Sequence, residues 1–138
     1  MLKVNKHGLV GIVILGLLSV VMTGCLAGSS QETRLLWSGT SGTNKMAYQY
    51  VDFTGTENGK ARVEAEETLV LAYAATIDKG TLTIQVRAPS KETVWETTLS
   101  ESIDEQQVEL VAPESGTYAI LVIGQDAAGD FDVSWLVR

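Results

Sequence analysis

The sequence contains few of the side chains that catalysis and metal binding use most often. Among its 138 residues it has one cysteine, Cys25, and one histidine, His7. A single cysteine excludes an intramolecular disulfide. The one histidine, His7, comes before Cys25. The chain beyond Cys25 therefore offers no Ser-His-Asp triad, no Cys-His pair and no zinc site of histidine and cysteine. Paired carboxylates could still act as acid and base, but no pair stands out, and we expect no enzyme.

Positive charge is also scarce. After residue 24 the chain holds 8 Lys and Arg against 17 Asp and Glu, which gives a net charge of −9. Nucleic-acid binding requires clustered Lys and Arg to neutralise phosphates, so this balance argues against a nucleic-acid partner. It also argues against electrostatic adhesion to anionic lipid.

The N-terminal segment has the organisation of a secretory signal. Lys3 and Lys6 precede an apolar run over residues 8–22, and small residues follow the run. The run is about 15 residues long, whereas a helix needs about 20 to cross the hydrocarbon core of a membrane. We therefore predict that residues 1–24 are an apolar signal helix, removed on export.

The end of this signal resembles the lipobox of bacterial lipoproteins. The matching positions are Met22, Thr23, Gly24 and Cys25, with Met22 where the family usually has leucine. The resemblance implies that signal peptidase cuts after Gly24, that diacylglycerol is joined to the Cys25 thiol, and that fatty acyl groups such as palmitate anchor the protein. An uncleaved signal anchor and an ordinary signal peptide remain alternatives. The anchor would place the protein on the extracytoplasmic face of a bacterial membrane.

The rest of the chain is predicted to be one all-β domain. Residues 25–33 are small and polar, as in a short tether, and residues 34–138 form the domain. Alternation and turn residues predict about eight or nine short strands. These strands cover residues 34–37, 46–53, 60–64, 68–76, 81–87, 93–99, 107–111, 117–123 and 131–137. Turns or loops are expected at 38–43, 55–59, 78–80, 100–105 and 124–129. The apolar strand 117–123 should be central.

Part of this pattern resembles bacterial pre-peptidase C-terminal domains and similar jelly-roll sandwiches. The resemblance rests on Ala112-Pro113, on Gly116-Thr117-Tyr118, on Gly129-x-Phe131-x-Val133 and on the strand 80–86. It covers residues 67–138, and the last strand also resembles that of small lipoproteins of Gram-positive bacteria. It implies an antiparallel, jelly-roll-like β-sandwich.

Two candidate ligand sites follow from the residues. Asp126, Asp130 and Asp132 surround a glycine turn, and carboxylates suit Ca²⁺, although turn chemistry also places Asp and Gly there. Trp37 and Trp95 are candidate platforms for a glycan, with core packing as the alternative. Alternation places Trp135 in the core.

The predicted function is a non-catalytic binding or envelope-associated module, anchored to the membrane through Cys25. Its partner would be an envelope protein or a glycan. The alternative function is a carbohydrate, cell-wall or calcium-binding module of the same fold. Apart from the covalent lipid, no cofactor is expected.

Overall fold

A computed structural model describes residues 32–138 of the chain. The predicted signal peptide, the lipobox residues Met22, Thr23 and Gly24, the lipidation site Cys25 and most of the tether lie outside these residues. Within the described part, no helix is long and apolar enough to cross a membrane.

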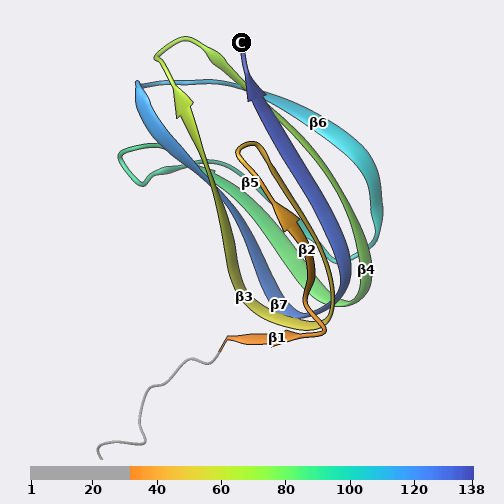
Figure 1. The fold of residues 1–138 in the computed structure, drawn as a ribbon. Coiled ribbons are helices and arrows are strands. Elements are labelled where there is room, and N and C mark those ends of the chain that lie inside the picture. Colours follow the sequence, from red (N-terminus) through yellow and green to blue (C-terminus); the bar gives the residue numbers. More distant parts are fainter. Residues whose placement is uncertain (1–31) are drawn as a thin grey trace, which may run out of the picture. The chain divides into compact units, whose positions relative to one another are not determined.

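Residues 32–138 form seven antiparallel strands that are joined in one hydrogen-bonded sheet (Figure 1). The strands are β1 (Thr33–Leu35), β2 (Ser38–Ser41), β3 (Lys45–Val63), β4 (Thr68–Arg87), β5 (Thr93–Leu99), β6 (Ile103–Val111) and β7 (Gly116–Val137). β7 pairs with both β3 and β4, which confirms that the apolar strand around residues 117–123 is central.

The three long strands bend together, so one continuous sheet forms both layers of a β-sandwich. One layer contains β2, residues 45–50 of β3, residues 129–137 of β7, residues 68–77 of β4, and β6. The other contains residues 55–63 of β3, 116–124 of β7, 81–87 of β4, and β5. We call these layers the first and the second layer. Figure 1 shows the bends at the end of the sandwich where β1 lies, with the C-terminus at the opposite end.

The bends correct three predictions made from the sequence. Residues 55–59, 78–80 and 124–129 were expected to be turns or loops, but each lies inside a long strand. Six of the expected strands are therefore joined in pairs into the three long strands β3, β4 and β7. β2 occupies part of the expected turn at 38–43, and β6 begins at Ile103, inside the expected loop at 100–105. The fold class is as predicted, with fewer and longer strands.

Glycines in the left-handed region allow β4 and β7 to bend without ending. Gly80 has φ of +70° and Gly129 has φ of +135°, values that side chains disfavour. The register of β4 against β7 shifts between Ile77 and Thr81, and β3 shifts against β7 between Tyr50 and Gly55. Such irregularities sharpen the twist of a strand while its ladder continues on both sides.

The core fills the space between the two layers. The alternation predicted for residues 82–86 is confirmed, because Leu82, Ile84 and Val86 are fully buried. On β7, Phe131, Val133 and Trp135 are buried in the same cluster. The layers contact each other directly. Trp135 of the first layer occupies the space where a side chain on Gly59 of the second layer would lie.

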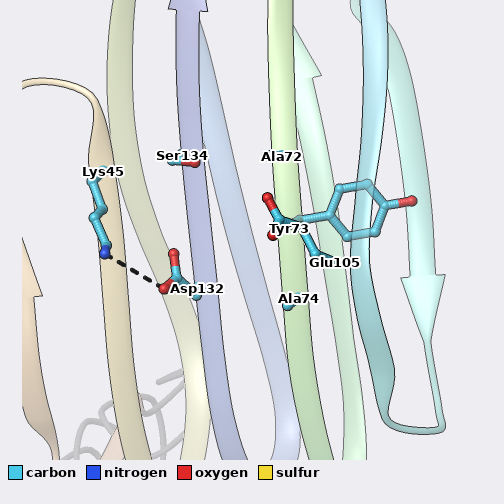
Figure 2. Close-up of a pocket in the computed structure, with 7 residues that line it drawn as sticks. All are labelled: Lys45, Ala72, Tyr73, Ala74, Glu105, Asp132 and Ser134. Carbon is cyan, nitrogen blue, oxygen red and sulfur yellow. Dashed lines mark ion pairs between the residues drawn. The ribbon is translucent and has the colours of Figure 1, made fainter.

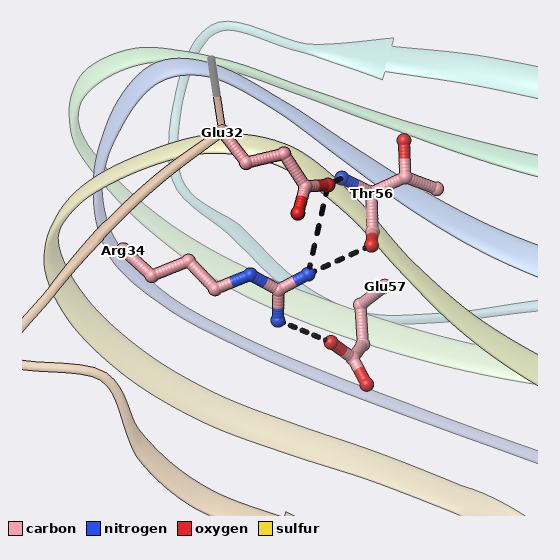
Figure 3. A network of polar contacts seen from close by, with 4 residues as sticks. All are labelled: Glu32, Arg34, Thr56 and Glu57. Carbon is pink, nitrogen blue, oxygen red and sulfur yellow. Dashed lines mark hydrogen bonds and ion pairs between the residues drawn. The ribbon is translucent and has the colours of Figure 1, made fainter.

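The short strand β1 is held to the bend by Arg34 (Figure 3). Its guanidinium lies 2.6 Å from a carboxylate oxygen of Glu57 and donates a hydrogen bond of 2.8 Å to the Thr56 carbonyl. The same guanidinium lies over the Trp37 ring, 4.5 Å from its centroid. Glu32 accepts a hydrogen bond from the Thr56 amide. The start of the described chain is therefore fastened to β3 by charge-assisted bonds as well as by the sheet.

Candidate functional site

The outer surface of the first layer is hollowed along most of its width. Three neighbouring hollows of about 270, 280 and 340 Å³ share lining residues with one another. Asp130, Asp132, Glu105 and Ala74 each line two of them. We call this surface the outer trough. It is lined on five strands by Ser38 of β2, Lys45, Ala47 and Gln49 of β3, Ala72, Ala74 and Thr76 of β4, Asp104 and Glu105 of β6, and Asp130, Asp132 and Ser134 of β7.

Register explains why these residues share one surface. Side chains alternate between the two faces of a strand, and the even-numbered positions 130–134 of β7 lie opposite the core positions Phe131 and Val133. Asp132 pairs with Ala47 on one side and Ala74 on the other. The floor of the trough is low because β3 and β4 contribute alanines beside this row of polar residues.

Charged groups flank the small residues of the floor. Figure 2 shows Lys45 reaching towards Asp132, with Ser134 beside them and Ala72 and Ala74 on the neighbouring strand. The Lys45 ammonium lies 3.5 Å from a carboxylate oxygen of Asp132, and about half of each side chain is exposed. Exposed ion pairs of this kind add little stability, so both groups remain available to a ligand.

The trough is acidic. Asp104, Glu105, Asp130 and Asp132 contribute four carboxylates, and Lys45 is the only positively charged residue lining the three hollows. Hydroxyl and amide groups from Ser38, Ser134, Thr76 and Gln49 lie between them. The surface therefore offers many hydrogen-bond acceptors and several donors.

The structure does not gather the three aspartates that the sequence suggested for calcium. Asp130 and Asp132 line the trough, whereas Asp126 lies in the bend of β7 with its backbone amide bonded to Thr54. Among residues 32–138, no group of three or more His, Cys, Asp or Glu side chains is arranged to hold a metal ion.

The tryptophans pack against the core and do not line the trough. Trp37 stacks on Tyr48 with 4.4 Å between ring centroids, and it also contacts Phe53. Trp95 is half-buried and packs on Tyr73 at 5.5 Å. Trp135 is 5% exposed, which confirms its predicted core position.

One polar group inside this region lacks a partner. Tyr50 is 5% exposed, and its hydroxyl makes no hydrogen bond within the described part of the chain. Burial, with added repulsion from the Asp130 and Asp78 carboxylates, raises the pKa of the Tyr50 hydroxyl. The phenol therefore stays neutral at physiological pH and supplies no charge to the trough.

Sequence reasoning identified the β7 part of this site and missed its other strands. Asp130 and Asp132 were placed opposite the core face of the last strand, as the structure has them. No motif marked the residues of the other strands, namely Lys45, Ala72, Ala74 and Glu105. Only alternation could have placed Ala72 and Ala74 on the outer face of β4, because they alternate with the core residues Leu71 and Ala75.

Comparison with solved structures finds proteins that resemble this chain to different degrees. A CBM4 carbohydrate-binding module superposes with a TM-score of 0.53 at 13% identity, covering 81% of this chain and 80% of that one. A carbohydrate-binding module from Cellvibrio mixtus lichenase 5A, in complex with cellotriose, gives 0.43 at 13% identity, covering 79% and 88%. A periplasmic inhibitor of g-type lysozyme from Aeromonas hydrophila gives 0.37 at 19% identity, covering 72% and 92%. No family model and no curated protein matches the chain. At 13% identity, the likeness to the CBM4 module shows the β-sandwich fold alone.

Proposed function

We propose that this chain is a non-catalytic binding module, anchored by lipid on Cys25 to the extracytoplasmic face of a membrane, and that it holds a glycan in the outer trough. The observation that carries the proposal is the trough itself, a set of adjoining hollows over five strands with alanines in its floor and polar groups along it. A flat floor accepts the face of a sugar ring. The polar groups match the hydroxyls around that ring.

The chemistry of the trough favours a glycan over a protein partner. The centres of protein interfaces are depleted of charged residues and enriched in large aromatic side chains. The aromatic residues that line the trough pack in or against the core, and its other side chains contribute carboxylates, amides, hydroxyls and alanines. The fold shared with a CBM4 module is consistent with this proposal, and the ligand is argued from the site.

The charge of the trough narrows the class of glycan. Four carboxylates face one ammonium, so a polyanionic chain that carries uronate or phosphate groups would be repelled. A neutral or amino-bearing glycan meets no such barrier. The aromatic residues that line the trough, Tyr48, Tyr73 and Phe131, pack in or against the core, so affinity would come from hydrogen bonds, many of them to charged acceptors.

Replacing Asp132 with alanine should weaken glycan binding without unfolding the protein. The side chain is about half exposed and lies at the centre of the trough, paired with Lys45. A hydrogen bond to a charged group contributes about 1.5–3 kcal/mol, so we expect Kd to rise roughly 10- to 100-fold. The measurement is isothermal titration with the neutral oligosaccharide that binds best on a glycan array.

The matched control for this variant is Glu96→Ala. It removes one carboxylate from the exposed strand β5 of the second layer, which contributes nothing to the trough. Its affinity should equal that of the unaltered protein. Equal weakening by both variants, or an array on which only acidic glycans bind, would contradict the proposal.

Replacing Cys25 with alanine should release the protein from the membrane. The thiol is the only group in the chain that can take a thioether-linked lipid, and two or more acyl chains anchor a protein stably where one does not. We expect the variant to lose incorporation of labelled palmitate and to lose cleavage after Gly24. Mass spectrometry of the N-terminus and fractionation of membranes measure both effects. Normal processing and full membrane retention of the variant would disprove the anchor.

A further inference from the structure

Three large apolar side chains are exposed together at the bend end of the sandwich. Leu35 is 55% exposed, Leu36 is 78% exposed and Val51 is 55% exposed. Leu35 pairs with Asp52, the residue after Val51, and Leu36 and Val51 line the same hollow. We call these three residues the bend patch. The other large apolar side chains exposed among residues 32–138 are Val94, Val111, Leu136 and Val137.

The conformation of Leu36 keeps its side chain at the surface. Leu36 lies between β1 and β2 with φ of +50°, a left-handed value that costs a branched aliphatic residue free energy. Arg34 and Trp37, on either side of the Leu35–Leu36 pair, are turned towards the core, where the guanidinium covers the Trp37 ring. The chain therefore has a strained connection that leaves two consecutive leucines in solvent.

The chain that would carry the anchor enters the domain beside this patch. Only the six residues 26–31 lie between Cys25 and Glu32, where the described structure begins, and Leu35 follows three residues later. At about 3.3–3.6 Å per residue, even a fully extended link from Cys25 to Glu32 spans less than about 30 Å. Such a link would keep Glu32 within about 30 Å of a lipid on Cys25.

We propose that the bend patch rests on the membrane surface, with Leu35, Leu36 and Val51 in contact with lipid. This inference rests on the lipid anchor at Cys25 given as part of the proposed function. Apolar side chains at a membrane interface gain the free energy of leaving water, and an anchored domain gains it without a separate cost of association. The contact fixes the orientation of the sandwich, with its bends towards the bilayer.

The charges near the patch determine which lipid suits it. Asp52, Asp78 and Asp126 lie in the bends of the three long strands together with Lys79, and Arg34, beside Leu35, is paired with Glu57. Anionic headgroups would repel this end of the domain. The contact is therefore with the interface of zwitterionic lipid, and phosphatidylcholine vesicles are the appropriate probe.

Quenching of tryptophan fluorescence by nitroxide-labelled lipid tests the contact. The mature, acylated protein is placed in phosphatidylcholine vesicles with and without doxyl-labelled phosphatidylcholine, which quenches only nearby fluorophores. Trp37 follows Leu36 directly, so we expect clear quenching in the unaltered protein. The double variant Leu36→Ser and Val51→Ser should reduce this quenching several-fold, because the polar side chains no longer gain from contact with lipid.

The matched control is Val111→Ser, which removes an exposed apolar side chain, 67% exposed, from the end of β6. This control should be quenched as strongly as the unaltered protein, and circular dichroism establishes that all variants are folded. Absence of acylation by mass spectrometry would disprove the anchor. Full acylation with quenching that is absent, or equal in the double variant, would disprove the contact alone and leave the anchor in place.

Discussion

Replacing Phe53 with alanine should reduce the free energy of unfolding by about 3–5 kcal/mol, the usual cost of deleting a fully buried aromatic side chain. Phe53 is 0% exposed and lies in the bend of β3. Its ring contacts Trp37 at 4.7 Å and Tyr50 at 5.3 Å between centroids. It also fills the space above Gly124 of β7. The substitution would leave a cavity at the point where both layers meet.

The size of this effect follows from how the domain is held together. With one cysteine in the whole chain, no disulfide can limit the unfolded state. Few of the ion pairs are shielded from water, so burial of apolar side chains supplies most of the stability.

Urea denaturation measures the change. Val51→Ala, two residues away on the same strand, is the control, and it should stay within about 0.5 kcal/mol because Val51 is exposed. A similar change in both variants would show that the bend of β3 does not depend on the Phe53 ring.

Alternation in the sequence was sufficient to find the core. In residues 82–86 and 131–135, apolar side chains recur at every second position, and these are the side chains that the structure buries. Only a strand of a half-buried sheet requires this period. Apolar residues on both faces of residues 117–123 predicted that this strand is central. The structure agrees, because Leu121 is only 7% exposed although it points away from the core.

Local sequence could not separate a bend from the end of a strand. Residues 55–59, 78–80 and 124–129 are rich in Gly, Asp and Asn, the residues that favour turns. A hairpin turn and a bend need the same left-handed backbone conformations, and they differ in which strand pairs with the residues that follow. The structure shows that residues on both sides of Gly80 pair with β7. That pairing is a long-range property of the chain.

The same limit applies to the candidate site. Asp130 and Asp132 could be assigned to the solvent face from their own strand, but a trough also needs small side chains on the adjacent strands. Ala47 and Ala74 supply them from strands that are distant in the sequence. Trp95 shows the opposite case. The sequence made it a candidate platform for a glycan, whereas in the structure its ring packs on Tyr73 from the other layer.

Replacing Gly129 with alanine should destabilise the fold by about 3–5 kcal/mol, among the largest effects of a single substitution. Gly129 has φ of +135°, and a methyl group there would overlap the carbonyl oxygen of Thr76 in β4. The strain cannot be relieved locally, because Gly129 pairs with Tyr50 on one side and Ile77 on the other. Movement at this residue would separate the three long strands where they bend.

Gly42→Ala is the matched control, because a methyl group on Gly42 would meet no atom within 4 Å. This variant should be unchanged or up to about 1 kcal/mol more stable, since alanine restricts the unfolded chain. Thermal and urea unfolding measure both variants.

Gly129 directly precedes Asp130, so the substitution should also affect the trough. At a temperature where the Gly129→Ala variant remains folded, this variant should bind the glycan more weakly, while Gly42→Ala binds normally. Normal stability of Gly129→Ala would show that β7 can bend without the left-handed glycine. In that case the trough would not depend on the geometry of the bend, and its shape would be a property of the first layer alone.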